Sequence, residues 1–145
     1  MRYAWDMRET FTIHTTQREQ LVDVTDAVRS IVKESSIQNG IVQVYAQGAT
    51  AAMMIQENWD DSVQLDVVNF LRKLIPPGVW LHDAQDGNGD SHLKAGLVGP
   101  SETIPVIDGE LGLSRWQNIF FCEFDGPRTD RRVVCTIIRD LDHDR

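Results

Sequence analysis

Two histidines, His82 and His92, stand at the ends of a polar loop, with the residues "DAQDGNGDS" between them. Imidazole is a common ligand of transition metals and exchanges protons near neutral pH. A loop that closes on itself would bring both rings and a carboxylate such as Asp90 to one point, as either chemistry requires. The alternative is a solvated loop with one structural histidine. For His14 we expect a cross-strand hydrogen bond, and for His143, in the charged tail, solvation.

Other polar groups gather at two further positions. The segment "QENWDD" places Glu57 and Asn58 directly after an apolar run, at a strand end where sites commonly form. A solvated turn is the alternative there. The segment "EFDGPRTDRR" contains a turn followed by Arg128, whose planar guanidinium can hold a phosphate through two hydrogen bonds. A surface ion pair with Asp130 is the other interpretation of Arg128.

Hydrophobic periodicity predicts two helices that position these groups. Helical spacing of apolar residues indicates helices over residues 25–36 and 62–75, with Thr25 and Ser62 as N-caps. The second helix carries an apolar stripe that includes Leu65, Leu71 and Leu74. We expect that stripe to face the core.

Alternating and short apolar segments predict strands over the rest of the chain. The expected strands are 9–16, 41–45, 50–58, 79–82, 93–99, 102–107, 117–124 and 131–138. Asp108-Gly109 is a strong signal for a hairpin turn between two of them. Two helices among seven or eight strands indicate an α+β fold, with mixed sheets folded over one another as in a sandwich and helices on one side.

Length and charge restrict the class of protein. With 145 residues we expect one compact domain, residues 1–145. The net charge of -8 argues against nonspecific binding of nucleic acid. No run approaches the roughly 20 apolar residues of a membrane helix, and the first residues do not resemble a secretory signal, so we expect no membrane partner and a cytoplasmic location. Cys122 and Cys135 are expected to be reduced, buried thiols.

The sequence lacks a Walker loop, a dinucleotide-binding glycine motif, a nucleophile elbow and a closed zinc site. Four blocks instead resemble the YjbQ family, an uncharacterised family also named secondary thiamine-phosphate synthase. The blocks are "LVDVTDAVRSIVKESSIQNGIVQVY", "TAAMMIQEN", "GNGDSHLKAGLVGPSETIPVIDGELGL" and "RWQNIFFCEFDGPRTDRR". The resemblance implies a compact α+β sandwich, a homotrimer, and a pocket built from the histidine motifs and shared between subunits.

The resemblance also implies roles for individual residues. His82 and His92 match two family histidines, but Gly48-Ala49-Thr50 stands where the family has a His-Thr-Thr stretch. A family site for a divalent metal, zinc or magnesium, would therefore be weakened by one missing ligand, unless Glu123 or Asp90 completes a facial set. The implied roles are catalysis for His82, His92 and Glu123, metal binding for His82 and His92, and substrate binding for Thr50, Glu57, Asn58, Asn88, Asp90, Lys94, Gln117 and Arg128.

Three functions are compatible with these residues. By resemblance, the first is weak thiamine-phosphate synthase activity, which transfers an aminopyrimidine from its diphosphate to a thiazole phosphate and requires stabilisation of the leaving diphosphate. The second is a non-catalytic trimeric binding or scaffold protein that lost the first family histidine, at Gly48. The third is metal-assisted phosphate hydrolysis by the same groups. The expected ligand is an anionic or phosphorylated small molecule.

Overall fold

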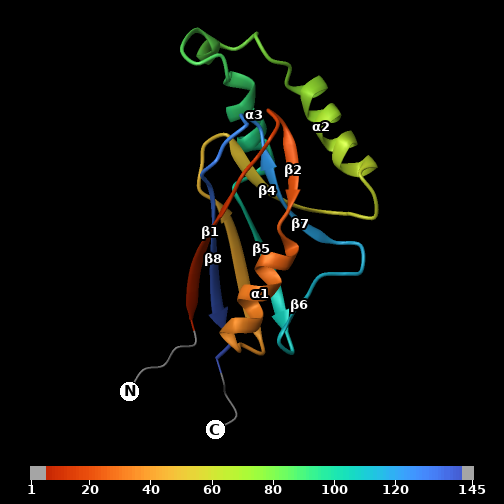
Figure 1. Ribbon diagram of the computed structural model, residues 1–145, viewed down its shortest axis with the longest axis vertical. Coiled ribbons are helices and arrows are strands. Elements are labelled where there is room, and N and C mark those ends of the chain that lie inside the picture. The colour runs from red at the N-terminus through yellow and green to blue at the C-terminus, as the bar shows by residue number, and fades with distance from the viewer. Residues whose placement is uncertain (1–5, 142–145) are drawn as a thin grey trace.

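Two antiparallel sheets and three α-helices make up the computed structural model, which describes residues 6–141 (Figure 1). The strands are β1 (Met7–Ile13), β2 (Gln20–Asp23), β3 (Gly40–Ala46), β4 (Ala51–Gln56), β5 (Ser101–Ile107), β6 (Glu110–Leu111), β7 (Asn118–Glu123) and β8 (Arg131–Arg139). The helices are α1 (Thr25–Ser35), α2 (Ser62–Leu74), α3 (Gly89–Val98) and the short 3-10 helix η1 (Leu81–Ala84). The α+β class predicted from the sequence is confirmed.

The larger sheet has the strand order β1-β8-β3-β5-β6, and the smaller has β2-β7-β4. In β3 the side chains alternate, so that Val42 and Val44 are buried while Ile41 and Tyr45 lie on the outer face. In β7 nearly every residue is buried, because both faces of the smaller sheet are covered. The predicted hairpin turn is confirmed, since β5 and β6 pair across Asp108-Gly109, both with positive φ.

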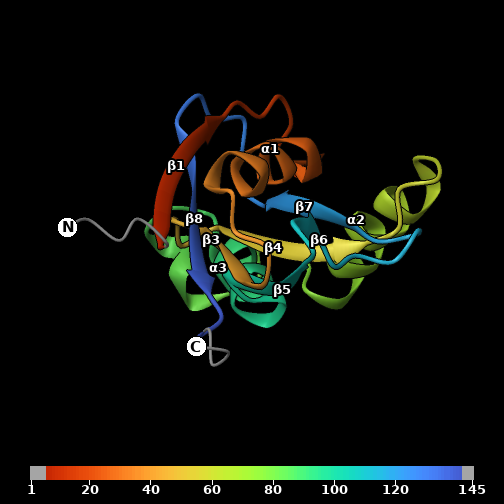
Figure 2. The same ribbon diagram turned by 90° about the horizontal axis from the view of Figure 1, so that it is seen from below.

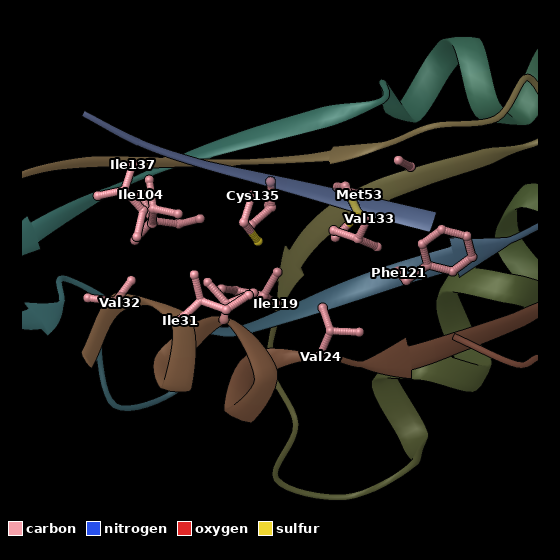
Figure 3. Close-up of a cluster of buried hydrophobic side chains, with 14 of the residues drawn as sticks. Val24, Ile31, Val32, Met53, Ile104, Ile119, Phe121, Val133, Cys135 and Ile137 are labelled. Atoms are coloured by element: carbon pink, nitrogen blue, oxygen red, sulfur yellow. The ribbon is translucent and has the colours of Figure 1, made fainter. Parts of the chain in front are cut away.

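The main hydrophobic core lies between the two sheets and α1. Figure 3 shows Ile31 and Val32 of α1 pointing toward Ile104 and Ile137 of the larger sheet, with Phe121 of the smaller sheet farther along the same layer. Figure 2 shows α1 inside the curve of strands that runs from β1 round to β7. This arrangement follows from the helical spacing of apolar residues in α1, which puts its buried side chains on one face.

A second core covers the opposite face of the smaller sheet. Its buried residues come from β2, β4, β7, α2, α3 and the residue after β7, and they are Leu21, Ala52, Leu71, Ala95, Phe120, Cys122 and Phe124. Helices α2 and α3 therefore lie on one side of the small sheet, while α1 lies on the other. Within residues 6–141 no helix is long and apolar enough to cross a membrane.

Helix α3 corrects the strand predicted at 93–99. Leu93 and Leu97, which lie within that range, are exposed, while Asp90, Ser91 and Lys94 are buried. The prediction failed because polar side chains that bind one another occupy the inner face of this helix. The strand predicted at 79–82 is also wrong, since η1 begins there, and β2 was missed.

The two longer helices match their predictions in extent but differ in detail. Thr25 and Ser62 are the first helical residues, not N-caps. Thr25 donates hydrogen bonds from its backbone N–H and its hydroxyl to Oδ1 of Asp23, and Ser62 donates the same two to Oδ1 of Asp60. The apolar stripe expected to be buried on α2 is largely open: Leu65 is 60% exposed and Leu74 is 54% exposed.

Candidate functional site

His82 and His92 meet because the segment that carries them folds back on itself. Asp83 of η1 accepts hydrogen bonds from the backbone N–H of Trp80, at 3.1 Å, and from that of Gly89, at 2.8 Å. Its carboxylate thereby joins η1 to the first residue of α3. Gly89 is required at this crossing, because a Cβ atom there would stand 2.7 Å from Cβ of Trp80.

The two imidazole rings are in contact, which is the first of the two arrangements considered for the loop between them. Their centroids are 4.7 Å apart and their planes are nearly perpendicular, at 88°. Nε2 of His82 lies 3.4 Å from a carboxylate oxygen of Asp86, so the imidazolium form of His82 has a counter-ion. Both rings are at least partly exposed. The pair can therefore donate a proton or a hydrogen bond to a ligand from solvent.

Asn88 and Arg128 come together through one carboxylate. Asp125 accepts a hydrogen bond from Nδ2 of Asn88 at 2.8 Å and from Nη2 of Arg128 at 3.0 Å. Oδ1 of Asn88 is buried without a hydrogen-bond partner. Arg128 keeps part of its guanidinium exposed, but the ion pair with Asp125 already occupies one edge of it. The alternative pairing with Asp130 is not the one formed.

Asp90 and Lys94 lie in a buried ionic cluster. Nζ of Lys94 is 2.8 Å from Asp90 and 3.1 Å from Glu19, and all three side chains are buried. Arg18 donates two hydrogen bonds to Asp90, and Arg72 donates one to Glu19. Burial by itself would raise the pKa of Asp90, but the hydrogen bonds from Arg18 and Lys94 hold it below its usual value.

Glu123 forms a separate buried cluster with Arg131. The Arg131 guanidinium hydrogen-bonds both carboxylate oxygens of Glu123 and the hydroxyl of Thr50, and Thr15 donates to Glu123 at 2.7 Å. A Cβ atom on Gly48 would stand 2.9 Å from Nη1 of Arg131. Glu123 and Thr50 therefore serve this ion pair, and Gly48 faces the same guanidinium.

Asn58, Glu57 and Gln117 belong to a different part of the surface. Asn58 donates a hydrogen bond of 2.5 Å to Asp23, and Gln117 accepts one from the backbone of Ser114. Burial would raise the pKa of Asp23, but hydrogen bonds from Thr25 and from asparagines keep it low. Glu57 lines a pocket described below. The structure therefore divides the predicted site residues among several groups.

The donor atoms do not fit a three-ligand metal centre. Within residues 6–141 no group of three His, Cys, Asp or Glu side chains is placed to hold a metal ion. Asp90 and Glu123 are committed to buried cations, so neither completes the histidine pair. His14 is exposed at the end of β1, and His143 lies outside the described residues.

Arg18 and Glu19 were missed by sequence reasoning. Both stand in the polar segment before β2, where nothing distinguishes them from solvated charges. Their partners Asp90 and Lys94 lie 72 and 75 residues away along the chain. The only available signal was a helical spacing between Asp90 and Lys94, which the strand prediction obscured.

Comparisons with known proteins agree in one family. The profile of the family described as "UPF0047 protein YjbQ-like" matches residues 9–140. A UPF0047 protein of Methanocaldococcus jannaschii is 47% identical over 130 residues, which cover 90% of this chain and 93% of that protein. A YbjQ-like protein of unknown function from Sulfolobus solfataricus has a TM-score of 0.90 at 32% identity, covering 93% and 98%. A hypothetical protein from Aeropyrum pernix has a TM-score of 0.88 at 36% identity, covering 92% and 99%.

Proposed function

The chain belongs to the UPF0047, YjbQ-like family, and on this premise we propose that it binds an anionic or phosphorylated small molecule at the His82–His92 pair and has at most weak thiamine-phosphate synthase activity. The observation that carries the proposal is the contact between exposed His82 and half-buried His92 at a centroid distance of 4.7 Å. An imidazolium and its neighbour offer two N–H donors to one phosphate group.

The transfer reaction defines what this pair contributes. The bond between the aminopyrimidine methylene carbon and a diphosphate oxygen breaks, and the diphosphate leaves with the electron pair. The ring nitrogen of the thiazole phosphate forms the new bond to that carbon. Negative charge develops on the leaving oxygen, so donors aimed at that atom lower the barrier. His82, held beside Asp86, and His92 are the donors we assign to this role.

This proposal contains no step at a metal ion. Zinc or magnesium was expected from the resemblance, but a zinc centre needs at least three protein ligands, and a third is not in place within residues 6–141. Magnesium takes oxygen ligands, so a pair of imidazoles does not suit it. Metal-assisted phosphate hydrolysis is disfavoured for the same reason. Elemental analysis of purified protein checks this point, and stoichiometric metal would overturn the assignment.

Titration with inorganic diphosphate tests the histidine pair. We expect His92→Ala to weaken binding at least about tenfold at pH 6, because one hydrogen bond to a charged group is worth about 1.5–3 kcal/mol. His14→Ala is the matched control, because His14 is also exposed but lies outside the pair. Equal dissociation constants for wild type and His92→Ala would refute the role of the pair. The same two variants are then compared for synthase turnover.

A second candidate function is a non-catalytic homotrimeric binding or scaffold protein. It is favoured by the exposed apolar side chains of α2, among which Phe70 and Leu74, four residues apart, share one face of the helix. Analytical ultracentrifugation gives the mass in solution. We expect a trimer that Leu74→Glu dissociates, with Lys73→Glu on the neighbouring position as control. A monomeric wild type would remove this candidate.

A further inference from the structure

Two exposed tryptophans meet at the edge of the molecule away from the histidine pair. Trp59 lies in the loop between β4 and α2, Trp116 in the loop between β6 and β7, and the two loops run side by side at the right of Figure 1. Their ring centroids are 5.3 Å apart and their planes make an angle of 73°. With Glu57 they line an open pocket of about 400 Å³.

The indoles are not part of either core. Trp59 is 69% exposed and Trp116 is 47% exposed. A tryptophan that packs in a core has most of its side chain buried. Two rings set at a corner present aromatic walls to a ligand. The face of an indole carries negative electrostatic potential and attracts cations.

The charge at this pocket favours a cation as well. The Glu57 carboxylate makes no ion pair or hydrogen bond within the described part of the chain. Asp60 and Asp61 directly follow Trp59 and add to the negative potential. An anionic ligand would be repelled here, so this pocket and the histidine pair call for ligands of opposite charge.

Arg115 shows that the Trp116 ring already holds a cation. Its guanidinium carbon lies 4.9 Å from the centroid of the Trp116 ring. Arg115 is exposed and can turn away into solvent. The guanidinium therefore acts as an internal competitor for the surface that a cationic ligand would use.

We propose that Glu57, Trp59 and Trp116 form a binding site for a small quaternary ammonium compound. The indoles supply ring faces and no hydrogen-bond acceptor, which suits a weakly hydrated cation without N–H groups. Glu57 is its counter-ion. The site uses neither His82 nor His92, so its test is independent of the proposed function.

Choline and its neutral isostere 3,3-dimethyl-1-butanol are the probes. The indole N–H signals are followed by NMR, and Trp80 is an internal reference because its Nε1 donates a 2.7 Å hydrogen bond to the carbonyl of Pro76. We expect choline to shift the Trp59 and Trp116 signals saturably, with a dissociation constant in the millimolar range, and to leave Trp80 unchanged. The isostere should bind at least about tenfold more weakly.

Three variants separate this site from an ordinary apolar patch. Trp59→Ala should abolish the choline response, Glu57→Gln should weaken it by about tenfold, and Arg115→Ala should strengthen it by about threefold because the competitor is gone. Equal binding of the isostere, an absent choline response, or weaker binding by Arg115→Ala would overturn the proposal. Shifts that depend on protein concentration instead of choline would also overturn it, and would assign the tryptophan pair to a contact between copies of the chain.

Discussion

Replacing Lys94 with methionine removes the central cation of the buried cluster. The Nζ atom lies 2.8 Å from Asp90 and 3.1 Å from Glu19, and the Lys94 side chain is fully buried. Methionine fills most of the same space, so the change deletes the charge with little change in packing. Two carboxylates are then left in a buried position with only Arg18 and Arg72, both partly exposed, as counter-ions.

The expected loss of stability is about 3 kcal/mol at pH 7. Removing one partner of a buried ion pair costs roughly 3–5 kcal/mol, because the remaining charge stays desolvated. The lower end applies here because Arg18 still donates two hydrogen bonds to Asp90, and Arg72 still donates one to Glu19. For a chain of this size, a loss of that magnitude lowers the melting temperature by about 10 °C.

The loss should shrink at low pH. Asp90 has a pKa below its ordinary value of 3.8, so its ionic contacts stabilise the wild type above that pH and are lost as the pH falls through the lower, folded-state pKa. Once Asp90 is protonated in both proteins, Lys94→Met no longer leaves its charge buried without Lys94. The difference in unfolding free energy between the two proteins therefore declines from pH 7 toward pH 3.

Urea unfolding at several pH values measures this difference. Lys73→Met, at an exposed position of α2, is the matched control and should change stability by less than about 0.5 kcal/mol. The double variant Asp90→Asn, Lys94→Met should recover part of the loss, since Glu19 is then the one buried carboxylate of the cluster that is left without Lys94. A loss under about 1 kcal/mol at pH 7, or one independent of pH, would refute the reasoning.

Two further predictions concern burial and close packing. Burial raises the pKa of Cys122 and Cys135 to about 12, so at pH 8 we expect only about one in 10⁴ of either thiol to be ionised, and iodoacetamide labelling followed by mass spectrometry should be slow until urea is added. Rapid labelling of the native protein would contradict this. Gly40→Ala should lose about 1–3 kcal/mol in urea unfolding, because its Cβ would stand 2.1 Å from the carbonyl oxygen of Ile138; an unchanged midpoint would show that the strands separate easily.

Periodicity predicted the elements whose inner face is apolar. Helix α1 was placed correctly because Val28, Ile31 and Val32 repeat with helical spacing and are all buried. The strands β3 and β8 follow for the same reason, since each alternates along the core face. In these elements local pattern and tertiary packing agree.

Helix α3 could not be predicted in this way. Its buried side is polar and its leucines face outward. The pattern of apolar residues therefore does not indicate the side of the helix that packs against the rest of the protein. What stabilises that side is pairing with Glu19 and Arg18, and such pairing across many residues leaves no local signal. The strand prediction at 93–99 was the direct result.

The candidate site was predicted in part. Convergence of His82 and His92 was one of two interpretations of the loop between them, and the rings are in contact. Asp90, expected beside them, is buried with Lys94 instead. The roles of Glu123 and Thr50 as partners of Arg131 were not foreseen, since they depend on β7 and β8 meeting the loop before β4. Sequence spacing describes neighbours along the chain, whereas these contacts join distant segments.

The position of β8 fixes when the larger sheet can be completed during synthesis. This last strand lies between β1 and β3, and it pairs with both along most of its length. While the chain is still being translated, β1 has no partner strand in that sheet, and one edge of β3 stays unpaired until residue 139 leaves the ribosome. Nascent chains that stall before β8 therefore expose unpaired backbone groups on β1 and β3, which can pair with other chains. Such stalled chains are the products that quality-control proteases would need to remove.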